Sequence, residues 1–357
     1  MCTVMQSEVQ KNGRQAILVL GMHRSGTSAV TRVLNLLGAA VPKTLLPTDE
    51  NNPRGYWESE RFYSLHDQML QAAGSCWYDW RVLNPDWFST RAANGFRKRI
   101  RATVISEYDS EPLIVLKDPR ICRFLPYLLE ILAELEIKPL ALHAFRNPLG
   151  VVQSLERRDG LPIQTSLLLW LRYVLDAEFQ SRHIPRCFIS YENLLADWRT
   201  TATRVASVMG LTWPHRAADV AMEIDEFLST DLRHEASTIQ DLRADASVVS
   251  WVKRAFNVFV ELENGNQDQH LLNTLDTIRA EFDEGCHTFG PEVHSSELLA
   301  MPLQTKNLTR ASDDWHLRLR VLELERGLDS FGYLFRAIWR KVIHLPRDLS
   351  RKLRGKK

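Results

Sequence analysis

A glycine-bounded loop contains the first residues that could do chemistry. The stretch GMHRSGTS runs from Gly21 to Ser28, directly after an apolar run and directly before a helical pattern. Gly21 lets the chain turn sharply off a strand, and Gly26 lets backbone N–H groups approach an anion closely. The N-terminus of the following helix adds free amides and its dipole. We therefore expect a phosphate-binding loop; a plain strand-to-helix turn with incidental glycines is the structural alternative.

The side chains of this loop suit phosphate-like oxygens but differ from those of a nucleotide-hydrolysing P-loop. Ser25, Thr27 and Ser28 can donate hydroxyl hydrogen bonds, and Arg24 supplies a planar guanidinium. A P-loop kinase carries a lysine directly after the second glycine, where it reaches the β- and γ-phosphates, whereas this chain has Thr27. The missing lysine weakens the kinase interpretation without removing phosphate binding.

The segments around the loop predict an α/β fold. Short, continuous apolar runs suit buried parallel strands, and they alternate here with segments of helical periodicity. The predicted strands are Ala16–Leu20, Pro112–Leu116, Pro139–Phe145 and Arg186–Ser190. The predicted helices include a pattern closed by Gly38, a helix from Glu60 onward with Ser59 as N-cap, Ser166–Phe179, and Glu192 to Gly210. Together they predict a doubly wound, P-loop-like parallel sheet flanked by helices.

A second motif follows the third predicted strand. Arg146 comes directly after that strand, so its side chain lies at the carboxyl end of the sheet, where α/β folds bind ligands. Pro148 suits the first helical turn, and Ser154 lies about two turns along. An arginine paired with a nearby acid and a serine bonded to its own helix is the structural alternative. The glycine loop favours the functional interpretation.

These two motifs resemble those of the sulfotransferases that use 3′-phosphoadenosine 5′-phosphosulfate, most closely their bacterial, Golgi-type-like carbohydrate branch. The similarity extends from Gln15 to about Trp213. The family binds the 5′-phosphosulfate in such a loop, with its positive residue inside the loop, and holds the 3′-phosphate with an arginine and a serine spaced as in this chain. The resemblance implies these donor-binding residues: Gly21, His23, Arg24, Ser25, Gly26, Thr27, Ser28, Arg146 and Ser154.

The segment LKDPR follows the second predicted strand. Asp118 and Pro119 suit a helix N-cap and a first helical position, so we expect Asp118 to be structural. A Walker B element is the alternative, and it would support a kinase. In the resembling family the lysine of a KDP at this place lies near the sulfuryl group. The resemblance therefore implies that Lys117, with Arg24, stabilises charge in the transition state.

The segment GYWESERFYSLHDQML is where the resemblance places the base that activates the acceptor hydroxyl. The family uses a glutamate or a histidine between the loop and the KDP segment. Glu58 is the expected base, because Tyr56 and Trp57 beside it could stack on a sugar or desolvate its carboxylate. His66 is the rival. A glutamate that merely suits a helix N-terminus is the structural alternative.

Composition limits the remaining function classes. The 357 residues include 45 Lys and Arg against 44 Asp and Glu, and 45% are hydrophobic, which argues against a nucleic-acid binder and a disordered chain. The five cysteines are scattered, so neither a disulfide framework nor a zinc site is expected, and no metal is expected in catalysis. Without a signal-peptide pattern or a long apolar run, a cytoplasmic location is expected.

The chain divides into three expected regions: a sulfotransferase-like α/β domain at 14–235, a helical extension at 236–311 and a basic, amphipathic helical tail at 312–357. Nine Lys or Arg lie between Arg336 and Lys357, beside an apolar stripe that begins at Phe331. Such a helix either contacts an anionic membrane surface from the cytoplasmic side or docks on the domain.

The sequence thus predicts a sulfotransferase that moves a sulfuryl group from 3′-phosphoadenosine 5′-phosphosulfate to a hydroxyl, releasing adenosine 3′,5′-bisphosphate. A carbohydrate or glycolipid acceptor, and a place in polysaccharide biosynthesis, are expected from the resemblance. Two alternatives remain. One is a P-loop kinase, which would need Mg²⁺ and ATP. The other is a non-catalytic sulfotransferase-like subunit of a glycan-synthesis complex.

Overall fold

A computed structural model describes residues 13–228 and 238–300 of the chain. The expected basic tail at 312–357 lies outside the described residues, as does the end of the expected extension. Contacts divide the chain into two units, Met1–His294 and Ser295–Lys357, and the strands found among the described residues belong to the first. Among the described helices, none is long and apolar enough to cross a membrane.

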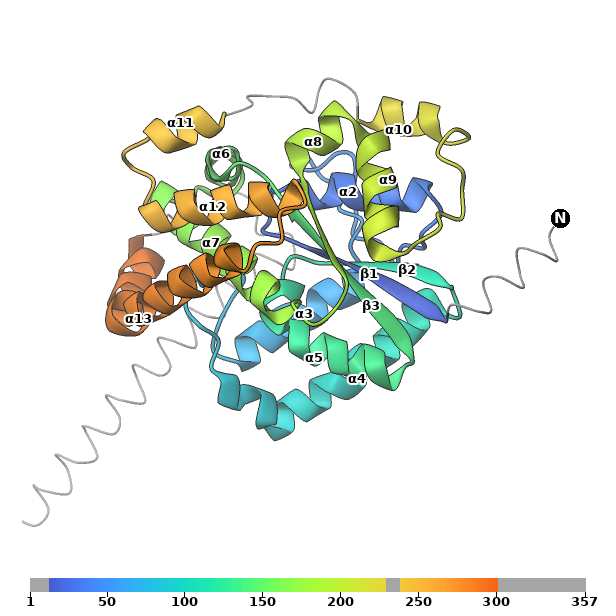
Figure 1. Ribbon diagram of the computed structural model, residues 1–357. Helices are drawn as coiled ribbons and strands as arrows, with labels where there is room; N and C mark the ends of the chain where they lie inside the picture. Colours follow the sequence, from blue (N-terminus) through green and yellow to red (C-terminus); the bar gives the residue numbers. More distant parts are fainter. Residues whose placement is uncertain (1–12, 229–237, 301–357) are drawn as a thin grey trace, which may run out of the picture. The chain divides into compact units, whose positions relative to one another are not determined.

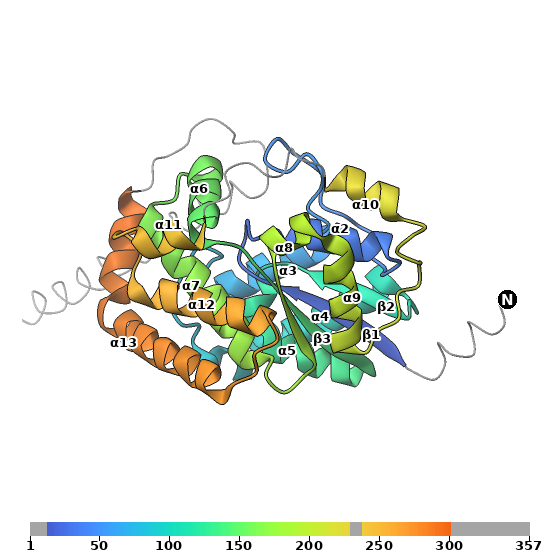
Figure 2. The same ribbon diagram turned by 45° about the horizontal axis from the view of Figure 1, so that its top comes forward.

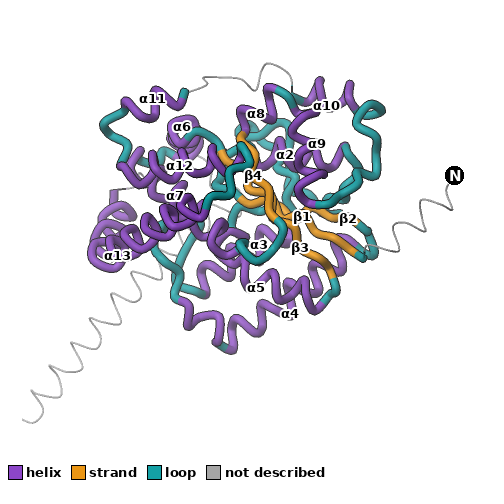
Figure 3. Tube along the Cα trace, viewed as in Figure 1, coloured by secondary structure: helices purple, strands orange, loops and turns teal. Residues whose placement is uncertain are grey.

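The centre of the first unit is a parallel four-stranded sheet in the order β2-β1-β3-β4 (Figure 3). Its strands are β1 (Arg14–Leu20), β2 (Leu113–Lys117), β3 (Ile137–Phe145) and β4 (Arg186–Ser190). In register, Ile17 lies beside Val115 on one side and Leu140 on the other. The parallel α/β fold and all four predicted strands are confirmed, with strand ends shifted by at most two residues.

Helices cover both faces of this sheet, which explains why the strands are continuously apolar (Figures 1 and 2). On one face, Ile17 and Val19 of β1 share a buried cluster with residues of α2 (Thr27–Leu36) and α9 (Trp198–Met209). On the other face lie α5 (Ile121–Glu134), α7 (Ile163–Gln180) and α12 (Ser250–Glu263). There Phe145 of β3 contacts Phe259 of α12, with ring centroids 5.5 Å apart.

The other helices follow the expected signals in most places. Ser59 caps α3 by accepting a hydrogen bond from the amide of Phe62, and Pro148 begins α6. Gly210 ends α9 in a left-handed conformation. These helices are α3 (Glu60–Ala72), the 3₁₀ helix η1 (Pro85–Ser89), α4 (Arg91–Tyr108), α6 (Pro148–Asp159), α8 (Tyr191–Ala196), α10 (Ala221–Phe227), α11 (Ile239–Ala244) and α13 (Gln269–Ala300).

Two local predictions are wrong. The helix expected from Glu192 to Gly210 is broken at Asp197, whose side chain caps the second half as the separate helix α9. Asp118 is not a helix N-cap, because α5 begins only at Ile121. The Asp118 carboxylate instead accepts a hydrogen bond from the amide of Arg120, two residues on. Residues 118–120 therefore form a tight turn that precedes the helix.

Candidate active site

Four chain segments with polar side chains meet at one edge of the sheet. Because all strands are parallel, their carboxyl ends lie at the same edge. The loop Gly21–Gly26 follows β1, and Lys117 is the last residue of β2. Arg146 directly follows β3, and Tyr191 directly follows β4. The fold therefore brings the two sequence motifs and the KDP segment into one region.

Close packing requires both glycines of the loop. A Cβ on Gly21 would lie 2.1 Å from the carbonyl oxygen of Ala144 in β3. Gly26 has a φ of 80°, and a Cβ there would lie 2.2 Å from the ring of Tyr191. Gly26 is the N-cap position of α2 and no side chain caps that helix, so the first-turn amides remain available to a ligand.

The hydroxyl of Ser25 is the clearest sign of a missing partner in the loop. Its Oγ is buried and has no hydrogen-bond partner among the described residues. A buried hydroxyl without a partner costs roughly 1–3 kcal/mol, and a bound oxyanion would remove that cost. Thr27, also buried, begins α2 directly after Gly26. This arrangement fits the phosphate-binding loop expected from the sequence.

Arg24 connects the loop to the second motif. Its Nε donates a hydrogen bond to Oγ of Ser154 on α6 at 2.7 Å, and its Nη1 donates one to the carbonyl of Asn51 at 3.2 Å. It has a φ of 68° and no carboxylate within ion-pair distance among the described residues. Burial, and then repulsion from Arg158, lower the pKa of Arg24 below its ordinary value. Such an unbalanced guanidinium is suited to an anionic ligand.

Arg146 is a second arginine available to an anion. Its guanidinium lies over the ring of Tyr191, 5.1 Å from the centroid. It also contacts Gly150 on α6 so closely that a Cβ there would lie 2.9 Å from Nε. Within the part of the chain that the structure describes, the Arg146 guanidinium makes no hydrogen bond or ion pair. Arg146 lies just before α6, and Ser154 lies about two turns further along, on that helix.

Lys117 joins β2 to the loop and to the expected base. Its buried Nζ donates hydrogen bonds to Oγ of Ser28 at 3.1 Å and to the carbonyl of Tyr56 at 3.0 Å, and it forms an ion pair with Oε1 of Glu58. Glu58 is buried as well, and burial raises the pKa of its carboxyl against the opposing effect of Lys117. The charge of Lys117 therefore acts directly on the ionisation of Glu58.

The rings beside Glu58 have other partners. The hydroxyl of Tyr56 donates a hydrogen bond to Asp49 at 2.8 Å. The Trp57 ring lies beneath the guanidinium of Arg32, 4.5 Å from its centroid, and its Nε1 donates a hydrogen bond to a backbone carbonyl. Glu58 is desolvated by its own burial, whereas Tyr56 and Trp57 are only partly buried. The structure gives Tyr56 and Trp57 local roles that the sequence did not predict.

His66, the rival base, contacts Asp118, the residue that follows Lys117. Its Nδ1 is 2.8 Å from Oδ2 of Asp118, and its buried ring lies between those of Phe62 and Phe124. Asp118 also accepts a hydrogen bond from Arg120 at 3.1 Å. Although burial alone would raise it, these two cationic or donor groups hold the pKa of Asp118 well below its usual range. Asp118 thus orders buried side chains behind Lys117.

The sequence model of one family, described as "Sulfotransferase family", matches residues 16–215. This chain belongs to the sulfotransferase family. Among solved structures, the sulfotransferase resembles one of Mycobacterium tuberculosis at 18% identity and a TM-score of 0.43, over 70% of this chain and 78% of that chain. It also resembles the sulfotransferase domain of the Synechococcus olefin synthase at 16% identity and a TM-score of 0.37, over 74% and 94%. No curated protein matches this chain.

The matched span of the sulfotransferase contains both glycines of the loop, Lys117, Arg146 and Ser154. Family membership favours sulfuryl transfer over the phosphoryl transfer of a kinase. The lysine at this site comes from β2 and contacts Ser28 at the start of α2, whereas a P-loop kinase places its lysine directly after the second glycine of the loop.

Sequence reasoning missed three residues of this sulfotransferase site. Arg120, whose side chain is buried between Asp118 and Asp67, carries positive charge behind the loop. Arg158 lies near the loop, and its spacing of four from Ser154 could have indicated a shared helix face. Trp77 lies beside His23, with ring centroids 4.9 Å apart. No sequence signal connected Trp77 with the loop, because the two are far apart along the chain.

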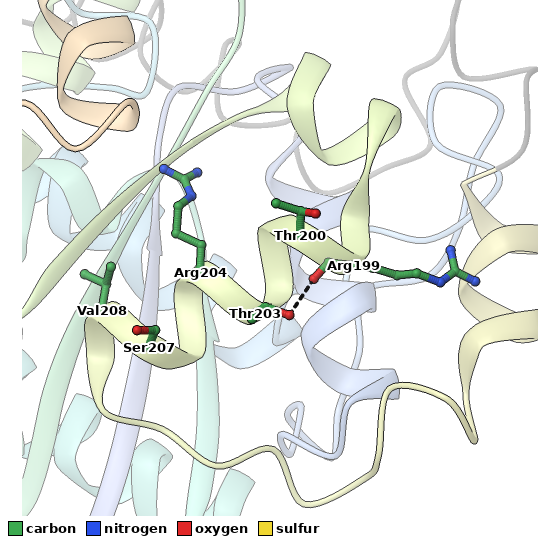
Figure 4. Close-up of a pocket in the computed structure, with 6 residues that line it drawn as sticks. All are labelled: Arg199, Thr200, Thr203, Arg204, Ser207 and Val208. Atoms are coloured by element: carbon green, nitrogen blue, oxygen red, sulfur yellow. Dashed lines mark hydrogen bonds between the residues drawn. The ribbon is translucent and has the colours of Figure 1, made fainter.

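A surface pocket on the outer side of α9 is a weaker candidate. Figure 4 shows its lining side chains projecting from this one helix, with Arg199 and Arg204 pointing away from one another. Arg199 forms an ion pair with Asp225, and Arg204 forms one with Glu263. Because its lining comes from α9 alone and includes none of the side chains at the strand ends, this pocket does not compete with the strand-end site as the place of catalysis.

Proposed function

We propose that this sulfotransferase takes its sulfuryl group from 3′-phosphoadenosine 5′-phosphosulfate and transfers it to a hydroxyl of a carbohydrate or glycolipid, as in the bacterial, Golgi-type-like branch of the family. The observation that carries the proposal is the hydrogen bond between Arg24 and Ser154. It joins a loop suited to one anion to α6, the helix that directly follows Arg146, a residue suited to another. A donor with anionic groups at both its 5′ and 3′ positions suits such a pair of sites better than a nucleoside triphosphate does.

The residues present fit this donor. The orphaned Ser25 hydroxyl, the uncapped amides of α2 and Arg24 would hold the 5′-phosphosulfate. Arg146 and Ser154 would hold the 3′-phosphate, and His23 with Gly21 would complete the loop's contacts. When bound, the donor supplies an activated sulfuryl group. Metal-independent binding is part of the proposal.

Two buried side chains would then carry the chemistry on the protein side. Sulfuryl transfer joins the acceptor oxygen to sulfur, breaks the bond between sulfur and the phosphate oxygen, and leaves the acceptor proton to be removed. Glu58 is the proposed base, because its raised pKa makes it a better proton acceptor than an ordinary carboxylate. Lys117 would stabilise charge on the departing phosphate oxygen.

The Lys117–Glu58 ion pair suggests how donor binding prepares the base. The three protons of the Lys117 ammonium are shared among Ser28, Tyr56 and Glu58. An anion in the loop would compete with Glu58 for this ammonium. Loss of that positive neighbour would raise the pKa of Glu58 further, since an opposite charge favours the ionised form.

The decisive experiment combines turnover with donor binding. Full-length protein is incubated with ³⁵S-labelled donor, without Mg²⁺, against a panel of neutral and acidic glycans and glycolipids, and adenosine 3′,5′-bisphosphate binding is measured by calorimetry. Label transfer together with bisphosphate binding tighter than that of ATP supports the proposal. Bisphosphate binding without transfer to any acceptor would favour the non-catalytic subunit, and Mg²⁺-dependent ATP binding would favour the kinase.

A cytoplasmic protein with a tail at the membrane surface remains part of this proposal, although the tail lies outside the described residues. Its nine basic residues and apolar stripe should make the full chain pellet with phosphatidylserine vesicles at low salt. Deletion from Phe331 should abolish pelleting and leave bisphosphate binding intact. Indifference of the full chain to these vesicles would instead assign the helix to the protein core.

A further inference from the structure

Residues 76–80 form a rigidly held segment that leaves one large ring half-exposed. Its other four residues are buried, whereas Trp77 is only partly buried. Side chains of α5 and α7 hold three of its carbonyls. These hydrogen bonds run from the Tyr173 hydroxyl to the Trp77 carbonyl at 2.7 Å, from Arg123 Nη1 to the Asp79 carbonyl at 2.6 Å and from Arg172 Nε to the Trp80 carbonyl at 2.9 Å. A ring fixed in this way binds at little conformational cost.

Trp77 lies where it can reach an acceptor. Its ring is 4.9 Å from that of His23, the residue that precedes Arg24 in the loop. The Nε2 of His23 is buried and has no hydrogen-bond partner among the described residues. Burial, and then repulsion from Arg120 and Arg158, lower the pKa of His23 well below its ordinary value. Trp77 therefore borders the loop at His23, whose ring nitrogen is open to a ligand.

Arg158 places a positive charge beside the Trp77 ring. It follows Ser154 by four residues on α6, so the two side chains share a helix face. Its guanidinium lies over the Trp77 ring, 5.4 Å from the centroid. Its Nε forms an ion pair with Asp159 at 2.7 Å, and its two Nη groups make no hydrogen bond with the described residues. Because Arg24 donates its hydrogen bond to Ser154, Arg158 lies on the face of α6 that meets the loop.

We infer that Trp77 and Arg158, next to His23 of the loop, form an acceptor subsite for a sugar that carries an anionic group, a carboxylate, phosphate or sulfate, beside the hydroxyl to be sulfated. This inference rests on the proposed function. The Trp77 ring offers an apolar surface to a sugar, and the fork of Nη donors on Arg158 matches an oxyanion. Arg24, Arg146 and Lys117 suffice for the anionic groups of the donor, which leaves Arg158 for the acceptor.

The test compares two matched sugars, methyl β-D-glucuronide and methyl β-D-glucoside, which differ in a carboxylate. Their binding to the full chain saturated with adenosine 3′,5′-bisphosphate is measured by saturation-transfer NMR titration. We expect the glucuronide to bind at least about tenfold more tightly, as a charge-assisted contact allows. Glucose 6-phosphate and glucose 6-sulfate, titrated against glucose, identify which anion is preferred.

Arg158→Gln should reduce the preference for the anionic sugar to about twofold or less and leave bisphosphate affinity unchanged. Arg157→Gln removes the same charge from the neighbouring, exposed residue and should retain the preference. Trp77→Ala should weaken anionic and neutral sugars alike. The inference is overturned if no anionic sugar is preferred by the wild type, if Arg158→Gln keeps the preference, or if Arg158→Gln weakens the bisphosphate instead. A wild-type chain that does not bind the bisphosphate would refute the proposed function itself.

Discussion

Lys117 and Glu58 form a buried ion pair at the carboxyl end of β2, and the same ammonium contacts Ser28 in the first turn of α2. Removing two charges from water is unfavourable unless each has partners, and Lys117 has three acceptors. The pair therefore ties the expected base to the glycine loop and the first turn of α2. It makes the ionisation of Glu58 sensitive to any anion bound there.

Glu58→Gln tests the base. We expect kcat to fall roughly a hundredfold or more, because a positioned carboxylate typically contributes 10²–10⁴-fold, while bisphosphate affinity stays nearly constant. A base works when deprotonated, so wild-type kcat should rise with pH through a pKa above 4.5, and this acidic limb should vanish in the variant. The matched control is Glu60→Gln, at an exposed neighbour, which should do little. Normal turnover in Glu58→Gln combined with an inactive His66→Ala would transfer the role to His66.

Proton uptake tests the exchange of Lys117 between Glu58 and a bound anion. If the ammonium turns toward the ligand, the pKa of Glu58 rises and the carboxyl takes up protons from solution. Calorimetry of bisphosphate binding near pH 6 in two buffers of different ionisation enthalpy should reveal this uptake. Glu58→Gln should remove it with little change in affinity. An uptake of the same size in that variant would show that the protons go elsewhere.

Arg146→Ala tests recognition of the 3′-phosphate. The wild type should bind adenosine 3′,5′-bisphosphate more tightly than AMP, and the variant should lose most of this difference, on the order of 1.5–3 kcal/mol. Competition calorimetry with both nucleotides measures it. The control Arg199→Ala removes an arginine of the α9 surface pocket and should leave the preference unchanged. A preference that survives the loss of Arg146 would place the 3′-phosphate elsewhere.

His143 should make the fold sensitive to acid. Burial, and then Arg186, lower the pKa of His143 to about 3, while its Nε2 lies 2.8 Å from Oγ of Ser181. Below pH 6.5 the unfolded chain protonates this histidine and the folded chain does not. The free energy of unfolding should therefore fall by up to about 1.4 kcal/mol per pH unit between 6.5 and 3 from this group.

The measurement is urea unfolding of wild type and His143→Gln at pH 7 and pH 5. The variant should lose less stability between these two values than the wild type does, whatever its stability at pH 7. His183→Gln, at an exposed histidine, should follow the wild type. Equal losses in all three proteins would mean that His143 titrates alike in both states.

Local patterns in the sequence determined the strands, most helix ends and the glycine loop between β1 and α2. A buried parallel strand needs a continuous apolar run, and a turn such as that at Gly26 needs a residue without a Cβ. Both features depend on residues that are adjacent in the sequence, so the sequence alone predicts them. The same reasoning placed Lys117 and Arg146 at the carboxyl ends of strands, and parallel pairing then brought them together.

The tertiary structure decided which of these side chains touch. Lys117 and Glu58 are 59 residues apart, and Arg24 and Ser154 are 130 apart, so neither contact leaves a periodic trace in the sequence. Asp118 fitted an N-cap locally, yet the partners Arg120 and His66 gave it another role. Contacts between distant residues depend on how helices pack around the crossovers of the sheet, and that packing is a property of the whole core. Only the folded chain could therefore show Arg158 above the ring of Trp77.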